Sequence, residues 1–109
     1  MKRYCFALDL QDDPVLIAEY ENWHSRIWPE VRESITSTGV ARMDIYRVGN
    51  RMFMIMDTED IFLLDDKAEK DAANPKVQEW EKLMWKYQKP LPFAKPGEKW
   101  MLMRKFFEL

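Results

Sequence analysis

The period of the apolar residues changes several times along this chain of 109 residues, and the order of the changes restricts the fold. Large apolar residues occupy every second position in 2–10, which is typical of a strand. After Asp13-Pro14, a favourable helix start, apolar residues recur every three or four positions and predict a helix. Trp28 precedes Pro29, which disfavours the α conformation at Trp28, so we expect the helical region to be broken there.

The middle of the chain has the pattern of a β-hairpin. The second helical stretch is predicted to end at Gly39, and alternation returns in residues 40–48 and 51–58. Gly49-Asn50 stands between these runs and is a two-residue turn signal. We therefore predict two neighbouring antiparallel strands.

The last third of the chain repeats the order of helix and strand. Residues 61–73 are acidic and helical in pattern, and a helix over 74–87 follows. The prolines and the glycine of 89–98 predict a surface loop. The pattern predicts a closing strand over residues 100–107.

The resulting order, β-α-β-β-α-β, predicts one α+β domain over residues 1–109 with the ferredoxin-like arrangement. In that arrangement an antiparallel sheet carries its helices on one face. The predicted strands bear apolar side chains on both faces, and one layer of helices covers only one of them. We therefore expect a homodimer, a dimeric α+β barrel, whose aromatic and methionine-rich faces are buried between the sheets.

Composition and charge exclude several classes of partner. The 17 basic and 19 acidic residues give a net charge of −2, without the basic surplus of nucleic-acid-binding proteins. No apolar run is long enough for a membrane span, and no signal peptide is apparent. The single cysteine, Cys5, cannot form an internal disulfide, so we expect a cytoplasmic protein.

The only histidine, His24, is the strongest candidate for acid/base chemistry. It lies at the expected break, residues 24–28, and shares a helical face with Tyr20. A histidine imidazole is the side chain best suited to give and take a proton at neutral pH. A histidine beside aromatic residues is, however, often structural, bonded to a carbonyl group.

Other groups of residues are weaker candidates for a functional site. One histidine and one cysteine cannot build a nitrogen and sulfur metal site, so no metal is predicted. A nucleophilic pair of Cys5 and His24 is conceivable, but a buried core cysteine fits the strand pattern better. We interpret Met52, Met54 and Met56 as core or dimer-interface packing.

A longer constellation resembles the L-rhamnose mutarotase family. It consists of Tyr20-x-x-x-His24, the run I-W-P-E at 27–30, Ile-Tyr at 45–46, and Trp80 in a late helix. Its most specific part is the unbroken H-x-x-I-W-P-E. The resemblance extends through nearly the whole chain and implies a dimeric ferredoxin-like fold, no cofactor and the interconversion of sugar anomers.

The resemblance also implies roles for individual residues. It makes His24 the proton donor and places Tyr20 and Trp80 against the sugar. Two positions depart from the rhamnose-type pattern: Met43 replaces a tyrosine, and Glu81 replaces a second tryptophan. Both positions are expected to bind substrate. The departures leave open whether the sugar is L-rhamnose or L-fucose, and we expect L-fucose to be at least as good a substrate.

Mutarotation suits these residue types without reference to the family. The reaction moves protons between the anomeric hydroxyl and the ring oxygen, so one acid/base group suffices and no cofactor is required. Tyr20 and Trp28 can supply hydrogen bonds and an apolar wall for the sugar's methyl face.

Three other functions are compatible with the element order. An RNA-recognition module would use aromatic residues of the first strand, but the sequence lacks the expected basic and glycine-containing strand motif. A cofactor-free monooxygenase or a haem-degrading relative would share the dimeric fold. A non-catalytic sugar-binding dimer would bind the sugar without exchanging its anomers.

Overall fold

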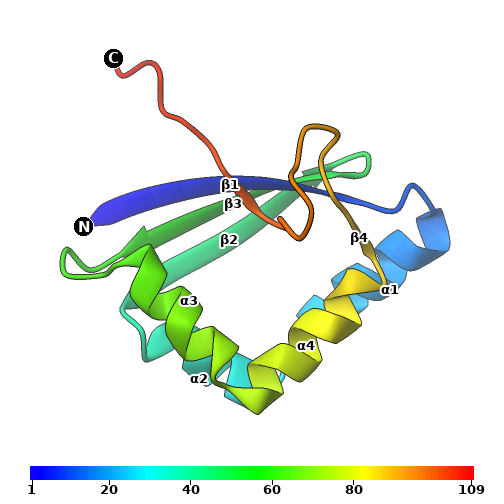
Figure 1. The fold of residues 1–109 in the computed structure, drawn as a ribbon. Helices are drawn as coiled ribbons and strands as arrows, with labels where there is room; N and C mark the ends of the chain where they lie inside the picture. The colour runs from blue at the N-terminus through cyan, green and yellow to red at the C-terminus, as the bar shows by residue number, and fades with distance from the viewer.

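The computed structural model describes all 109 residues and contains four helices and a five-stranded sheet (Figure 1). None of the helices combines the length and apolar character that a membrane span requires. The elements are, in chain order, β1 (Lys2–Leu10), α1 (Pro14–His24), α2 (Pro29–Thr36), β2 (Val40–Val48), β3 (Arg51–Thr58), α3 (Leu64–Ala72), α4 (Pro75–Trp85), β4 (Gln88–Lys89) and β5 (Met101–Leu102).

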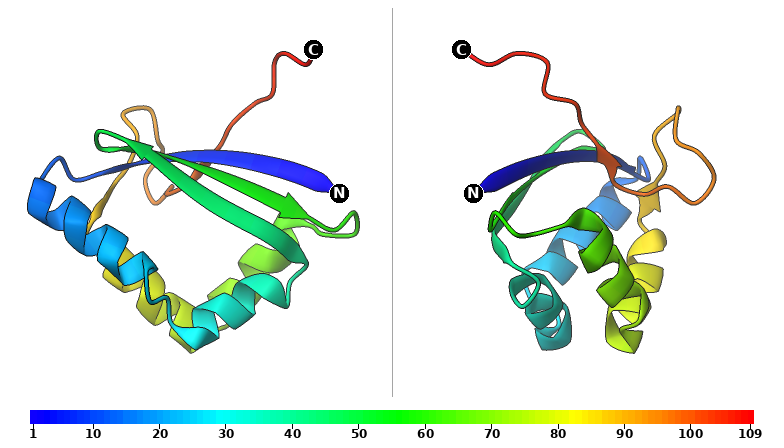
Figure 2. Two further views of the ribbon diagram at one scale, coloured as in Figure 1. Left: turned by 180° about the vertical axis from the view of Figure 1, so that it is seen from behind. Right: turned by 60° about the vertical axis from the view of Figure 1, so that its left-hand side comes forward.

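The sheet is antiparallel, with β1 at its centre. The strand order is β2-β3-β1-β4, and the short β5 pairs with another part of β1. All four helices lie on one side of this sheet, with α1 beside α4, and α4 also contacts α2 and α3 (Figure 2). The ferredoxin-like α+β fold predicted from the order of elements is confirmed, and each helical region consists of two helices, as predicted.

The break in the first helical region is confirmed. The Asp13 carboxylate caps α1, accepting from the backbone amides of Val15 at 2.9 Å and Leu16 at 3.2 Å. Trp28 is extended, with φ −60° and ψ 138°, because Pro29 follows it and begins α2. His24 is consequently the last residue of α1, directly before the break.

The predicted hairpin is also confirmed. Val48 pairs with Arg51 across the turn, and Gly49 has a φ of 59° while Asn50 keeps a negative φ. A positive φ at the first central residue alone is the pattern of a type II′ turn. This conformation favours glycine at position 49.

The prediction of a closing strand over residues 100–107 is wrong in its extent. Only Met101–Leu102 pair with β1, followed by one further bond from the Met103 amide to the Cys5 carbonyl at 2.7 Å. The chain then turns away from the sheet edge, so the following backbone groups have no strand to pair with (Figure 1). Phe106 is 84% exposed in this segment.

The helix predicted over 74–87 ends at Trp85, and the next residues form an unpredicted strand, β4. The chain leaves the helix there because β1 offers bonding partners: the Tyr87 carbonyl accepts from the Gln11 amide at 2.8 Å, and Gln88 pairs with Leu10. These bonds attach the segment that follows α4 to the end of β1, and they place Gln88 in the interior.

The methionine-rich face of the sheet lies beneath the helices, which corrects the expectation that it packs between two subunits. Met52 and Met56 are 2% and 3% exposed, and Met52 pairs with Leu8 on the same face. The opposite, outer face has a half-buried apolar centre formed by Cys5, Ala7, Phe53 and Ile55.

Candidate active site

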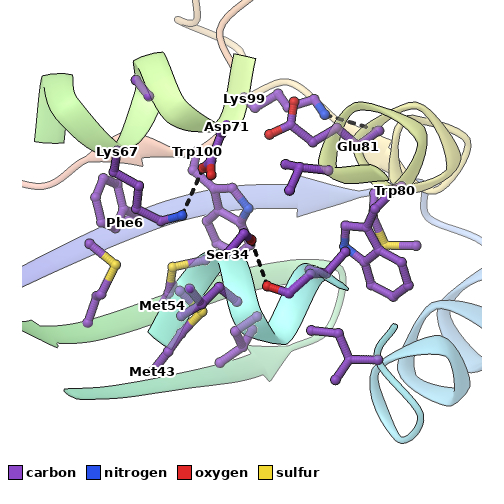
Figure 3. A pocket seen from close by; sticks show the side chains of 18 of the residues that line it. Phe6, Ser34, Met43, Met54, Lys67, Asp71, Trp80, Glu81, Lys99 and Trp100 are labelled. Atoms are coloured by element: carbon purple, nitrogen blue, oxygen red, sulfur yellow. Dashed lines mark hydrogen bonds and ion pairs between the residues drawn. The ribbon is translucent and has the colours of Figure 1, made fainter. Parts of the chain in front are cut away.

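A cavity of about 620 Å³ lies between the helices and the inner face of the sheet. Its walls are mostly apolar, with side chains from β1, β2, β3 and all four helices. Figure 3 shows Met43 and Met54 reaching into it from the sheet, with Trp80 and Glu81 on one side and Lys67 with Asp71 on another. The cavity combines an aromatic wall with a few polar groups, which is typical of small-molecule sites.

His24 lines this cavity from the end of α1. Its Nδ1 lies 2.9 Å from the backbone carbonyl oxygen of Tyr20. A carbonyl oxygen only accepts, so Nδ1 carries the proton in this bond. A hydrogen bond to a backbone carbonyl is what a purely structural histidine would also make. In this site, however, the bond leaves Nε2 as the nitrogen that can exchange a proton with a ligand.

Tyr20 lies one turn before His24, and their rings are 4.5 Å apart between centroids. Its hydroxyl oxygen accepts from the Nε2 amide group of Gln88 at 3.1 Å. Burial of the phenol raises the pKa of Tyr20 to about 12, outweighing the lowering effect of the Gln88 bond. Tyr20 is therefore a neutral hydroxyl at any physiological pH.

Trp80, 7% exposed, supplies the aromatic wall next to His24. The two rings meet edge to face at 5.6 Å between centroids. Trp28 packs on Trp80 from behind, at 5.2 Å and 69°, and does not itself line the cavity. Trp28 therefore contributes to the site only indirectly, because it packs against Trp80 and holds that ring in place.

Met43 and Glu81, the positions that depart from the rhamnose-type pattern, both line the cavity. Met43 stands on β2, opposite Met56 of β3. Glu81 is on α4, half-buried, and its carboxylate is 3.4 Å from the Nε2 of Gln78. Lys99 donates to the Glu81 carbonyl at 3.1 Å, and burial lowers the pKa of Lys99.

Several lining residues were not predicted from the sequence. Gln88 was missed because it belongs to the unpredicted strand β4, and no residue pattern marks a two-residue strand. Lys67 and Asp71 form an ion pair at 2.8 Å and are only 14% and 20% exposed. Their spacing of four residues on a helix is a signal that could have been used.

The nucleophilic pair of Cys5 and His24 is not assembled. Phe6 lines the cavity, and Cys5 is its neighbour on the same strand. Successive residues of a strand point to opposite faces, so Cys5 lies on the outer face of the sheet, away from His24.

A smaller cavity of about 180 Å³ adjoins the other side of His24. It shares Tyr20, His24 and Ile45 with the main cavity. Arg47 on β2 forms its outer wall together with Glu21 on α1, and their side chains are joined at 3.0 Å. His24 and Tyr20 therefore border both cavities.

Comparison with known proteins supports a relation to sugar mutarotases. Residues 3–109 match the family of L-rhamnose mutarotases. The L-fucose mutarotase of Xanthomonas campestris pv. campestris is 46% identical over 111 residues, which cover 100% of this chain and 89% of that protein. The chain belongs to the L-rhamnose mutarotase family. The L-rhamnose mutarotase of Phocaeicola vulgatus is 31% identical over 98 residues, covering 88% of this chain and 85% of that protein.

As a member of the L-rhamnose mutarotase family, the protein is an isomerase. The crystal structure of the L-rhamnose mutarotase from Formosa agariphila aligns with 100% of this chain and 99% of its own, with a TM-score of 0.74 and 19% identity. Tetracenomycin F2 cyclase from Streptomyces glaucescens, a type-II polyketide cyclase, aligns with 100% of this chain and 97% of its own, with a TM-score of 0.65 and 17% identity. At these identities the likeness concerns the fold alone.

Proposed function

We propose that this member of the L-rhamnose mutarotase family interconverts the α and β anomers of a 6-deoxy-L-hexose, with His24 as the general acid/base. The observation that supports this most directly is the bond between His24 Nδ1 and the Tyr20 carbonyl. It fixes the tautomer and leaves Nε2 available in a cavity that is walled by Trp80.

A single imidazole nitrogen, Nε2 of His24, is enough to move the protons of this reaction. Nε2 of the neutral imidazole takes the proton of the anomeric hydroxyl, and the resulting imidazolium gives a proton to the ring oxygen as the bond between this oxygen and the anomeric carbon breaks. The open chain carries an aldehyde, which rotates before the same steps run in reverse. Both oxygens are attached to the anomeric carbon, so a single nitrogen can serve them in succession.

The Tyr20 hydroxyl complements this step. It remains protonated because its pKa is raised to about 12, and it can donate to the ring oxygen while negative charge develops there. The aromatic edge of Trp80 and the side chain of Met43 offer apolar contacts to the methyl group of a deoxy sugar.

We infer that L-fucose is at least as good a substrate as L-rhamnose. The two sugars differ in the orientation of the hydroxyl groups at C2 and C4, so a site tells them apart by its hydrogen-bond partners. Glu81 provides a carboxylate that can accept two hydroxyl protons, and Met43 provides no donor. The 46% identity with an L-fucose mutarotase supports the same preference.

We also propose that the protein is a cytoplasmic homodimer. The apolar centre of the outer sheet face and the exposed apolar residues at the end of the chain support the dimer. Phe106 and Phe107, which are 84% and 70% exposed, would be covered by a partner subunit. The single unpaired cysteine supports a reducing compartment.

Saturation transfer between the two anomeric proton signals in NMR tests the proposed reaction. We expect the protein to accelerate exchange for L-fucose and L-rhamnose, and to act less on L-galactose, which carries a hydroxymethyl group in place of the methyl group of L-fucose. Unchanged exchange rates for both deoxy sugars would contradict the proposal. Clearly faster L-rhamnose exchange with inert L-fucose would contradict only the sugar preference.

A further inference from the structure

We propose that Gln88 is a positioning residue, which keeps the Tyr20 hydroxyl a hydrogen-bond donor toward the sugar. The assignment rests on the proposed mutarotation and adds a residue to it. Gln88 belongs to β4, where it pairs with Leu10 of β1, and it is 4% exposed. It also borders the main cavity.

The direction of the hydrogen bond carries the argument. The Nε2 group of Gln88 donates to the Tyr20 oxygen at 3.1 Å, so this oxygen uses one lone pair as an acceptor. The phenolic proton cannot lie along the same line and has to point elsewhere. Tyr20 makes no hydrogen bond to an acceptor in the protein through this proton. Since Tyr20 lines both cavities around His24, a ligand oxygen is the partner that remains.

The other end of the amide shows that packing alone does not explain Gln88. Its Oε1 atom is buried and has no hydrogen-bond donor. A buried acceptor without a partner is destabilising, and such groups in native proteins often coincide with functional sites. A side chain chosen only for stability would be apolar at this position, among Leu10, Tyr20 and Tyr87.

An oriented Tyr20 hydroxyl would stabilise the transition state of ring opening. The ring oxygen of the sugar gains negative charge while the ring opens, so a donor aimed at it binds the transition state more strongly than the ground state. Loss of this orientation is expected to lower kcat by about tenfold, with a smaller change in KM.

Two substitutions of Gln88 separate orientation from packing. Gln88→Glu keeps the size of the side chain. While its carboxyl group is protonated it can still donate to Tyr20, but once ionised it is only an acceptor and draws the Tyr20 proton away from the sugar. Gln88→Met removes the hydrogen bond at every pH.

The experiment is a double-mutant cycle measured as a pH profile of anomer exchange. For Gln88→Glu we expect kcat to fall about tenfold as pH rises through the ionisation of the new carboxyl group. For Gln88→Met we expect a similar loss that does not depend on pH. Both effects should shrink below twofold in a Tyr20→Phe background, because the hydroxyl that Gln88 orients is then absent. Gln11→Glu is the matched control: Gln11 is exposed and its side-chain amide bonds only the Gln88 backbone carbonyl, so the native profile should persist.

Equal losses for Gln88→Met in the native and Tyr20→Phe backgrounds would overturn the assignment, since a purely structural role acts in both. This comparison also decides the question if Gln88→Glu unfolds at high pH. Failure of the native protein to exchange any 6-deoxy-L-hexose would instead overturn the proposed function itself.

Discussion

The imidazole of His24 is held by the backbone carbonyl of Tyr20, 2.9 Å from Nδ1. Two residues one helical turn apart are thereby coupled: the main chain of Tyr20 selects the tautomer of His24, and its side chain stands beside the same ring at 4.5 Å. The catalytic proposal depends on this pairing, because it leaves one nitrogen for proton exchange and places a neutral hydroxyl next to it.

The raised pKa of Tyr20 predicts a specific loss of stability in alkali. In the unfolded chain the phenol ionises near its ordinary pKa of 10, whereas in the folded protein it stays protonated until about pH 12. Above pH 10 the unfolded state therefore binds fewer protons, and the free energy of unfolding falls as pH rises. We expect a decrease of roughly 2–3 kcal/mol from this residue by about pH 12. Denaturation curves of the native protein and Tyr20→Phe should diverge in this range, and parallel curves would contradict the burial of the phenol.

The Asp13 cap predicts a stability effect at the end of α1 far from the site. Asp13→Ala removes the acceptor for the Val15 and Leu16 amides, and we expect the free energy of unfolding to fall by about 1 kcal/mol. Asp12→Ala removes a neighbouring exposed carboxylate that does not cap the helix, and it should change stability by less than half as much. Urea denaturation measures both, and equal effects would count against the cap.

The two unusual positions in the cavity wall predict a change of sugar preference. The double substitution of Met43→Tyr and Glu81→Trp introduces the residues of the rhamnose-type pattern. We expect it to shift the ratio of exchange rates for L-fucose and L-rhamnose at least tenfold toward L-rhamnose, because a carboxylate partner is lost and a hydroxyl donor is gained. An unchanged ratio would show that neither side chain distinguishes the sugars.

The outer face of the sheet predicts the oligomeric state. We expect light scattering at micromolar concentration to give twice the 13.2 kDa mass of one chain. Phe53→Lys places a charge in the apolar centre of this face and should produce a monomer. Val15→Lys changes a residue of α1 that is 66% exposed and should leave the dimer intact. A monomeric native protein would refute the proposed dimer.

The sequence predicted those features that local chemistry determines. The cap at Asp13, the break before Pro29 and the turn at Gly49 follow from the conformations that these residue types favour, and all three are present. The position of His24 at the break followed from the same proline. The order of elements then predicted the fold.

The remaining features depend on contacts between distant parts of the chain. Residues 104–107 were predicted to continue the last strand, but beyond Met103 the chain has no neighbouring backbone to pair with, so the sequence overestimated the extent of this strand. Alternation also could not tell which face of β3 the helices cover, and the methionines proved to face inward. Gln88 reaches Tyr20 across 68 residues of sequence, a contact that no local pattern reveals.

The most direct test of the account is the exchange of L-fucose anomers by His24→Asn, measured beside the native protein by NMR saturation transfer at neutral pH. Asparagine can keep a side-chain N–H near the Tyr20 carbonyl but cannot give and take a proton as imidazole does. With fold and oligomeric state unchanged, we predict that the catalysed rate falls by about 10²–10⁴-fold. A rate within a few fold of the native protein would contradict the acid/base role of His24 and make it a structural residue.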